Sequence, residues 1–220
     1  QKAYITINGC VVTGKLQQLL RDRYSGSDIS DHIRAKTGLS IADMTRIDWD
    51  NLGMALERQQ LFTKVQLVKF MHNWLNTGHQ KKQIDKNAVD ACPICLDAEE
   101  TWWHLFQCQH KDSLTIRTLA LILFKSNLLR LETAPILREV LYYKVAQWCK
   151  LPSIPVLLIP DDEVGDMIRD AMETQNKIGW ENFIKGQICI KWKFAQHMFK
   201  EAMPTFGSYD KEAWSSRVIT

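Results

Sequence analysis

The 220-residue sequence lacks a run of about 18 or more apolar residues, so no part of it predicts a membrane span. The short apolar run LALILF, residues 119–124, is typical of a buried helix instead. The sequence also has no starting Met and no signal-peptide pattern, because it begins QKAYITING. From this beginning we expect a fragment or an excised domain.

Cysteine is scarce as well, and its spacing argues against a disulfide framework. Three of the six cysteines cluster and three stand alone in apolar surroundings: Cys92, Cys95 and Cys108, then Cys10, Cys149 and Cys189. This distribution favours one metal site in a reducing compartment, the nucleus or the cytoplasm, over paired disulfides.

The periodicity of the remaining sequence predicts a mainly α protein, a helical domain with a small N-terminal β-hairpin and an inserted Cys-Cys-His-Cys zinc knuckle. Asn8-Gly9 predicts the hairpin turn between strands Tyr4–Ile7 and Cys10–Val12. Helical patterns cover eight segments: 14–24, 27–38, 48–59, 61–75, 112–131, 133–150, 161–175 and 178–203. Three regions follow, 1–58, 59–150 and 151–220, unless the chain forms one domain.

Several details of these helices are specific enough to check. Thr13, Asp48, Asp112 and Thr133 are good N-cap candidates. An apolar stripe on helix 61–75 predicts a core face: Leu61, Val65, Val68, Met71, Trp74 and Leu75. Gly78 would end this helix, and HQKKQIDK after it predicts a polar, basic loop. Helix 178–203 is apolar around much of its circumference, which predicts packing on two sides.

The segment CPICLDAEETWWHLFQCQH, residues 92–110, carries the clearest chemistry. Cys92 and Cys95 form a C-x2-C pair around Pro93, and thiolates at that spacing can reach one tetrahedral ion. His104 and Cys108 are four residues apart, so a helix would place both on one side. Thiolate and imidazole ligands together favour one Zn²⁺.

Two questions stay open at this site. His110 is an alternative fourth ligand to Cys108, although a residue six positions after His104 points away on a helix. Four ligands close the coordination shell, which predicts a structural ion; a zinc enzyme would keep one position open and need a nearby base. Glu100 fits better as the start of the helix that carries His104, and the H-x-E…P-C-x2-C order of deaminases is absent.

Basic residues gather before and after the metal motif. Residues 58–86 contain six basic residues and one acid, whereas the tail after Leu151 has ten acids and eight bases. A nucleic-acid surface would combine lysines for phosphates with an aromatic for base stacking. The candidates are Lys64, Lys69, Lys81, Lys82, Lys86, Trp102 and Trp103. Adjacent tryptophans face different directions on a helix, so one is expected in the core and one nearer the surface.

The motif CPICLDAEETWWHLFQC resembles the zinc-binding region that follows the reverse transcriptase domain in non-LTR retrotransposon-like proteins. That region has a CPxC pair, a Glu-Thr step, a His and a Cys four residues on. The flanking stretches ITINGCVVTGKLQQLLRD and IGWENFIKGQICIKW are also similar to uncharacterised retroelement-like proteins. The resemblance implies a module downstream of a polymerase that helps to hold template RNA or target DNA.

The sequence itself contains no Tyr-x-Asp-Asp step and no spread of acids for a two-metal site. We therefore expect a module that is not an enzyme, binds RNA or DNA, and has the polymerase part of the same protein as a further partner. The alternative is a zinc-stabilised protein-interaction or scaffold module, domesticated from such an element and without nucleic-acid binding.

Overall fold

The computed structural model describes most of the chain after residue 30, together with two short pieces before it: residues 6–7, 10–11, 31–154, 156–201 and 211–219. Internal contacts divide the chain into two compact units, residues 1–45 and 46–220. This division is coarser than the three predicted regions, which stay a prediction. None of the described helices is long and apolar enough to cross a membrane.

The first unit contains little described structure. Strands β1 (Thr6–Ile7) and β2 (Cys10–Val11) pair antiparallel, with Thr6 opposite Val11 and Ile7 opposite Cys10. The turn and outer ends of the predicted hairpin, and the predicted helix 14–24 with Thr13, lie outside the described residues. Residues 31–37 are helical and end at Gly38, whose φ of 70° suits glycine, as predicted. A short helix, α2 (Ile41–Met44), follows.

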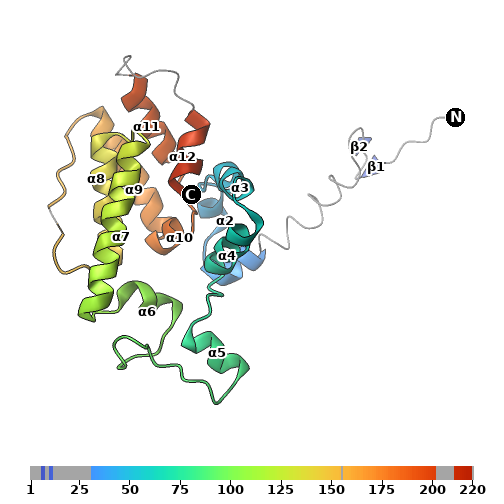
Figure 1. Cartoon of the computed structure of the whole chain (residues 1–220). Helices are drawn as coiled ribbons and strands as arrows, with labels where there is room; N and C mark the ends of the chain where they lie inside the picture. The colour runs from blue at the N-terminus through green and yellow to red at the C-terminus, as the bar shows by residue number, and fades with distance from the viewer. Residues whose placement is uncertain (1–5, 8–9, 12–30, 155, 202–210, 220) are drawn as a thin grey trace. The chain divides into compact units, whose positions relative to one another are not determined.

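The second unit is mainly helical, as the sequence predicts (Figure 1). Its helices are α3 (Trp49–Glu57), α4 (Leu61–Met71), α5 (Gly78–Ile84), α6 (Trp102–Gln107), α7 (Lys111–Arg130), α8 (Pro135–Trp148), α9 (Glu163–Ile178), α10 (Trp180–Ile184), α11 (Lys191–Glu201) and α12 (Lys211–Ile219). Helix α7 packs on α8, α9 on α11, and α12 on α3. Residues far apart in the sequence therefore share one core.

The predicted N-caps are confirmed at one position and wrong at two. Asp48 caps α3 by accepting a hydrogen bond from the Asn51 N–H. Helix α7 is capped by His110, two residues before the predicted cap Asp112, which lies inside the helix. Helix α8 begins at Pro135, so Ala134 takes the N-cap position and Thr133 instead accepts a hydrogen bond from Trp214. Proline at the first helical position sets this boundary, because it has no N–H to satisfy.

The prediction of one helix over 178–203 is wrong, because the chain breaks twice there. Gly179 has φ of 95° and separates α9 from α10, and Gly186 has φ of 86° after α10. The irregular stretch that results is held by Gln175, which is fully buried. Its Oε1 accepts from the Cys189 N–H at 2.8 Å and from Trp192 Nε1 at 3.3 Å. Packing on two sides nonetheless holds for Trp192, which has no exposed surface.

The predicted core stripe of helix 61–75 is also wrong. Helix α4 ends at Met71, and none of its residues is buried. Leu61 is 77% exposed and Val65 43%, while the side of α4 that contains Phe70 packs inward. Several apolar residues lie all round α4, so the periodicity alone did not fix which side faces the core.

The basic segment after α4 is a helix and not the predicted loop. Helix α5 begins at Gly78, and Thr77 caps it by accepting from the Gln80 N–H. Gly78 is required by close packing, because a Cβ there would lie 2.9 Å from Asp90 Cα. Gly78, which was predicted to end helix 61–75, is therefore the first residue of the next helix.

Candidate metal centre

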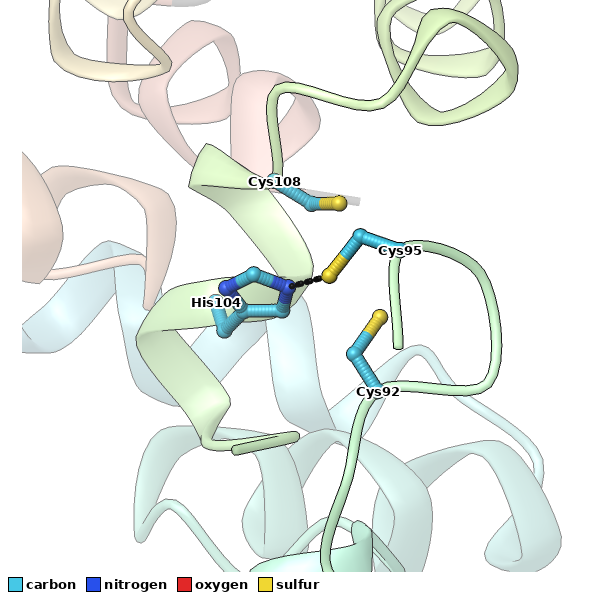
Figure 2. Close-up of side chains that lie close together, drawn as sticks. All are labelled: Cys92, Cys95, His104 and Cys108. Atoms are coloured by element: carbon cyan, nitrogen blue, oxygen red, sulfur yellow. Dashed lines mark hydrogen bonds between the residues drawn. The ribbon is translucent and has the colours of Figure 1, made fainter. Parts of the chain in front are cut away.

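Four predicted ligands meet at one point between a turn and helix α6 (Figure 2). The ligand atoms of Cys92, Cys95, His104 and Cys108 all lie within 4.8 Å of one another. Ligands on a tetrahedral ion at about 2.3 Å stand about 3.8 Å apart, so small movements bring the four onto one ion. The cluster can hold one metal ion, and its three sulfurs and one nitrogen match a soft divalent cation.

The first two ligands come from a tight turn. The Leu96 N–H donates to the Cys92 carbonyl at 2.9 Å, which folds the backbone so that Cys92 and Cys95 face the same point. The Cys92 N–H donates to the Ala98 carbonyl at 2.7 Å and closes the returning strand against the turn. Leu96 has φ of 61°, the left-handed conformation that a turn of this kind requires.

The other two ligands come from helix α6 and its end. Thr101 caps α6 by accepting a hydrogen bond from the His104 N–H at 3.1 Å. The Cys108 N–H donates to the His104 carbonyl at 2.8 Å, so the two residues are one helical turn apart, although Cys108 is the C-cap and not a helix residue. His104 Nε2 lies 3.3 Å from Cys95 Sγ and faces the cluster.

The surroundings shift the pKa values of the two buried thiols, Cys92 and Cys108, in opposite directions. Burial raises the pKa of Cys92 above its usual value. Burial is the largest single influence on the pKa of Cys108 and would raise it, but hydrogen bonds from the Ser113 side chain, the His110 backbone and the neighbouring thiols of Cys95 and Cys92 together leave that pKa lowered. Cys108 is therefore the more readily ionised of the two, as a thiolate ligand must be.

The alternative ligand and the nearby acids have other roles. His110 is not part of the cluster, and its Nδ1 accepts from the Asp112 N–H as the cap of α7. Glu99 lies 2.6 Å from His79, and Glu100 accepts from the Gly78 N–H at 2.5 Å. Glu100 thus supports the start of α5, and the prediction that it stabilises the start of α6 is wrong.

Two residues of α7 hold Cys108 from behind, and the sequence reasoning missed both. Ser113 is buried, and its side chain lowers the pKa of Cys108. Arg117 is 7% exposed and donates from Nη2 to the Cys108 carbonyl at 2.5 Å. Their spacing of four residues puts both on one face of α7. The available signal was a single arginine inside the apolar stretch TIRTLALILF.

Helix α6 is fixed to the helical core by an aromatic cluster. Trp102 is 5% exposed, and its ring lies 5.6 Å from that of Phe70 and 5.0 Å from that of Phe106. Lys185 Nζ lies 4.5 Å from the centroid of the Trp102 ring. Because its faces are covered, Trp102 cannot stack on a base, and the structure removes it from the predicted nucleic-acid residues. Trp103 is 43% exposed, which agrees with the expectation of one inner and one outer tryptophan.

The predicted lysines lie on two helices and on the loop between α5 and the turn that contains Cys92 and Cys95. Lys64 and Lys69 belong to α4, and Lys64 is half-buried. Lys82 pairs with Asp90 at 2.6 Å, which lowers the pKa of that carboxyl. Lys69, Lys81 and Lys86 are exposed, and among the described residues none of the three forms an ion pair. They are the predicted lysines most available to a phosphate.

Helix α5 is joined to the metal turn by polar contacts from three of its residues. Gly78 donates to Glu100, His79 contacts Glu99, and Lys82 pairs with Asp90. These contacts hold residues 77–108, called here the metal segment, as one local structure. Lys81 and Lys86 therefore belong to the same local structure as the four residues of the metal cluster.

Comparison of the chain with models of known families, with curated proteins and with solved structures finds no match. What this chain does is therefore inferred from its own residues and their geometry.

Proposed function

We propose that Cys92, Cys95, His104 and Cys108 bind one structural Zn²⁺, and that the chain is a non-catalytic nucleic-acid-binding module of a retroelement-type reverse transcriptase protein. The observation that carries the metal proposal is the convergence of the four ligand atoms within 4.8 Å. Three thiolates and an imidazole are a common ligand set of structural zinc, and four protein ligands leave no open position for a substrate.

The nucleic-acid proposal is supported by the surface of the metal segment. Lys81 and Lys86 offer unpaired positive charges for phosphates, and Trp103 offers a partly exposed ring in the same segment. Glu99 and Glu100, the carboxylates that directly precede α6 in the sequence, are both engaged by α5. This surface favours contact with a polyanion over catalysis. The similarity of the Cys-His motif to the zinc region of retroelement proteins points the same way.

Binding to single-stranded RNA and to duplex DNA, measured by filter retention at several salt concentrations, tests this proposal. We expect Lys81→Ala/Lys86→Ala to weaken binding to all sequences and to reduce the slope of log K against log salt by about one for each lysine. Trp103→Ala is expected to cost about 1–3 kcal/mol of binding to the single strand.

A matched control removes the same number of positive charges elsewhere. Lys150→Ala/Lys177→Ala changes two exposed lysines outside the metal segment, and we expect its affinity and salt slope to stay close to those of the wild type. Equal losses in the two double variants would reduce the effect to net charge and reject the assigned surface.

A protein-interaction module is the second candidate, favoured by the outer side of α7. Five large apolar residues of this helix are between 51% and 64% exposed: Ile116, Leu119, Ile122, Leu123 and Leu129. Apolar surface in that amount is typical of a contact with another protein. The polymerase part of the same protein is the partner that the motif resemblance implies.

The outer side of α7 could instead bind a second copy of this chain. Sedimentation of the wild type and of Leu119→Glu/Leu123→Glu tests for such self-association. The second candidate would be favoured over the first by two results together. The wild type would bind neither RNA nor DNA, and it would bind a polymerase domain tightly, with Leu119→Glu/Leu123→Glu abolishing that binding.

A further inference from the structure

Arg117 is a buried cation whose own hydrogen bonds are incomplete. Its Nη2 donates to the Cys108 carbonyl, but Nε and Nη1 are buried and have no hydrogen-bond partner among the described residues. A guanidinium has five N–H donors, and a buried charge without a counter-charge costs several times more than a surface one. An anion near Arg117 would offset this cost.

The protein around Arg117 offers no carboxylate for this purpose. Among the described residues Arg117 forms no ion pair. It lines a cavity of about 280 Å³ whose other walls are almost entirely apolar, with Leu121, Phe124 and Val145 among them. Cys149 lies on the same cavity, and its thiol stays protonated at neutral pH because burial raises its pKa to about 11.

We propose that the metal centre itself is the counter-charge of Arg117, so that the bound ion stabilises the packing of α7 as well as the metal segment. The two positive charges of Zn²⁺ and the three negative charges of the thiolates leave the centre with one net negative charge. Arg117 reaches that centre through Cys108, the ligand it already contacts. This inference rests on the zinc part of the proposed function and is independent of nucleic-acid binding.

In this arrangement, whether Arg117 stabilises or destabilises the folded protein depends on whether the metal is bound. With zinc bound, the guanidinium and the anionic centre form a buried pair, and removing the cation leaves the centre uncompensated. Without zinc, the anionic centre is not assembled, and the buried guanidinium is left without a counter-charge. Arg117→Met, which keeps an unbranched side chain but loses the charge, separates the two states.

The experiment measures chemical unfolding of the wild type and Arg117→Met, each loaded with one equivalent of zinc and each stripped with a chelator. We expect Arg117→Met to raise the unfolding equilibrium constant of the zinc-loaded protein by about a hundredfold and to lower that of the zinc-free protein. Arg130→Met, on the same helix but exposed, is the matched control and should change neither state by more than a few-fold.

An equal destabilisation of both states by Arg117→Met would overturn the proposal, because Arg117 would then act through packing alone. If Arg117→Met does not fold, hydrogen exchange in the wild type decides. Chelation should then speed the exchange of residues 111–121 of α7 by more than tenfold while leaving α9 protected. Unchanged exchange in α7 would equally reject the coupling.

The failure of the zinc proposal gives a different result from the failure of this inference. A wild-type chain that takes up no zinc removes the metal centre, and the unfolding curves with and without zinc then coincide. A chain that binds zinc but shows the same zinc-dependent stabilisation in Arg117→Met keeps the metal centre and loses only its link to Arg117.

Discussion

The metal segment (77–108) and the helices α9 to α11 (163–201) are built on different principles. In the metal segment the only buried apolar side chains are those of Cys92, Trp102 and Cys108. In the helices α9 to α11 the buried set includes Ile168, Ile178, Phe183, Ile188 and Trp192. The first region is thus organised by ligands and polar contacts, and the second by apolar burial.

This difference explains which changes each region should tolerate. A short segment with few buried apolar groups cannot offset its loss of chain entropy without another source of free energy. A bound ion would supply that source, and its binding free energy would become folding free energy for the segment. The helices α9 to α11 need no ion, but they depend on complete packing and on polar groups such as Gln175 that are satisfied inside it.

Metal removal should separate the two regions most strongly. Structural zinc contributes roughly 10 kcal/mol or more in small zinc domains, so we expect residues 92–108 to lose their protection from hydrogen exchange after chelation. Helices α9 and α11 should keep most of theirs. Full protection of 92–108 in the stripped protein would mean that packing, and not an ion, holds the metal segment.

Truncation of Trp192 should destabilise helices α9 to α11 and leave metal binding by the metal segment unchanged. Its side chain has no exposed surface, and Trp192→Ala is expected to lower the free energy of unfolding by about 3–5 kcal/mol. Zinc content per folded chain should stay at one, because Trp192 is no part of the metal segment. A matched Trp103→Ala, at a 43% exposed position, should cost far less; similar losses in the two variants would contradict the comparison.

Gln175→Leu should show that α9 to α11 also depend on one polar residue. The change leaves the Cys189 N–H and Trp192 Nε1 without their acceptor, and unsatisfied buried donors cost about 1–3 kcal/mol. Denaturant unfolding measures the loss, with Gln147→Leu on exposed α8 surface as the control. A neutral Gln175→Leu would show that burial alone suffices there.

The smallest effect is expected at Leu96, and it is a gain. Leu96 is 72% exposed and has φ of 61°, a conformation that costs a non-glycine residue about 1–2 kcal/mol. Leu96→Gly should therefore strengthen zinc binding slightly, by up to about tenfold in competition with a chelator. Weaker binding in Leu96→Gly would show that the Leu96 side chain contributes to the turn.

Local features of the structure could be predicted from the sequence because their causes are local. Asp48 caps α3, Gly38 ends a helix, and the spacing from Cys92 to Cys108 brings four ligands together. In each case the partners lie in one short stretch of the sequence, at most the 17 residues from Cys92 to Cys108, so the pattern contains the information.

Features that depend on how separate helices and loops pack together were missed or misplaced. The side of α4 that faces the core is chosen by Phe106 and Trp102, more than thirty residues away. The breaks at Gly179 and Gly186 need Gln175 to satisfy the irregular backbone. Arg117 acquires its role only because α7 lies behind Cys108. Periodicity and spacing contain no information about such contacts.

Metal analysis of the purified chain tests the central claim most directly. Three proteins are compared by elemental analysis and by the visible spectrum after cobalt substitution: the wild type, Cys95→Ala and Cys189→Ala, the last a buried cysteine outside the cluster. We expect one zinc per chain in the wild type and in Cys189→Ala, with intense thiolate–cobalt bands, and a marked loss of both in Cys95→Ala. Equal metal content in Cys95→Ala and the wild type, or none in either, would contradict the account.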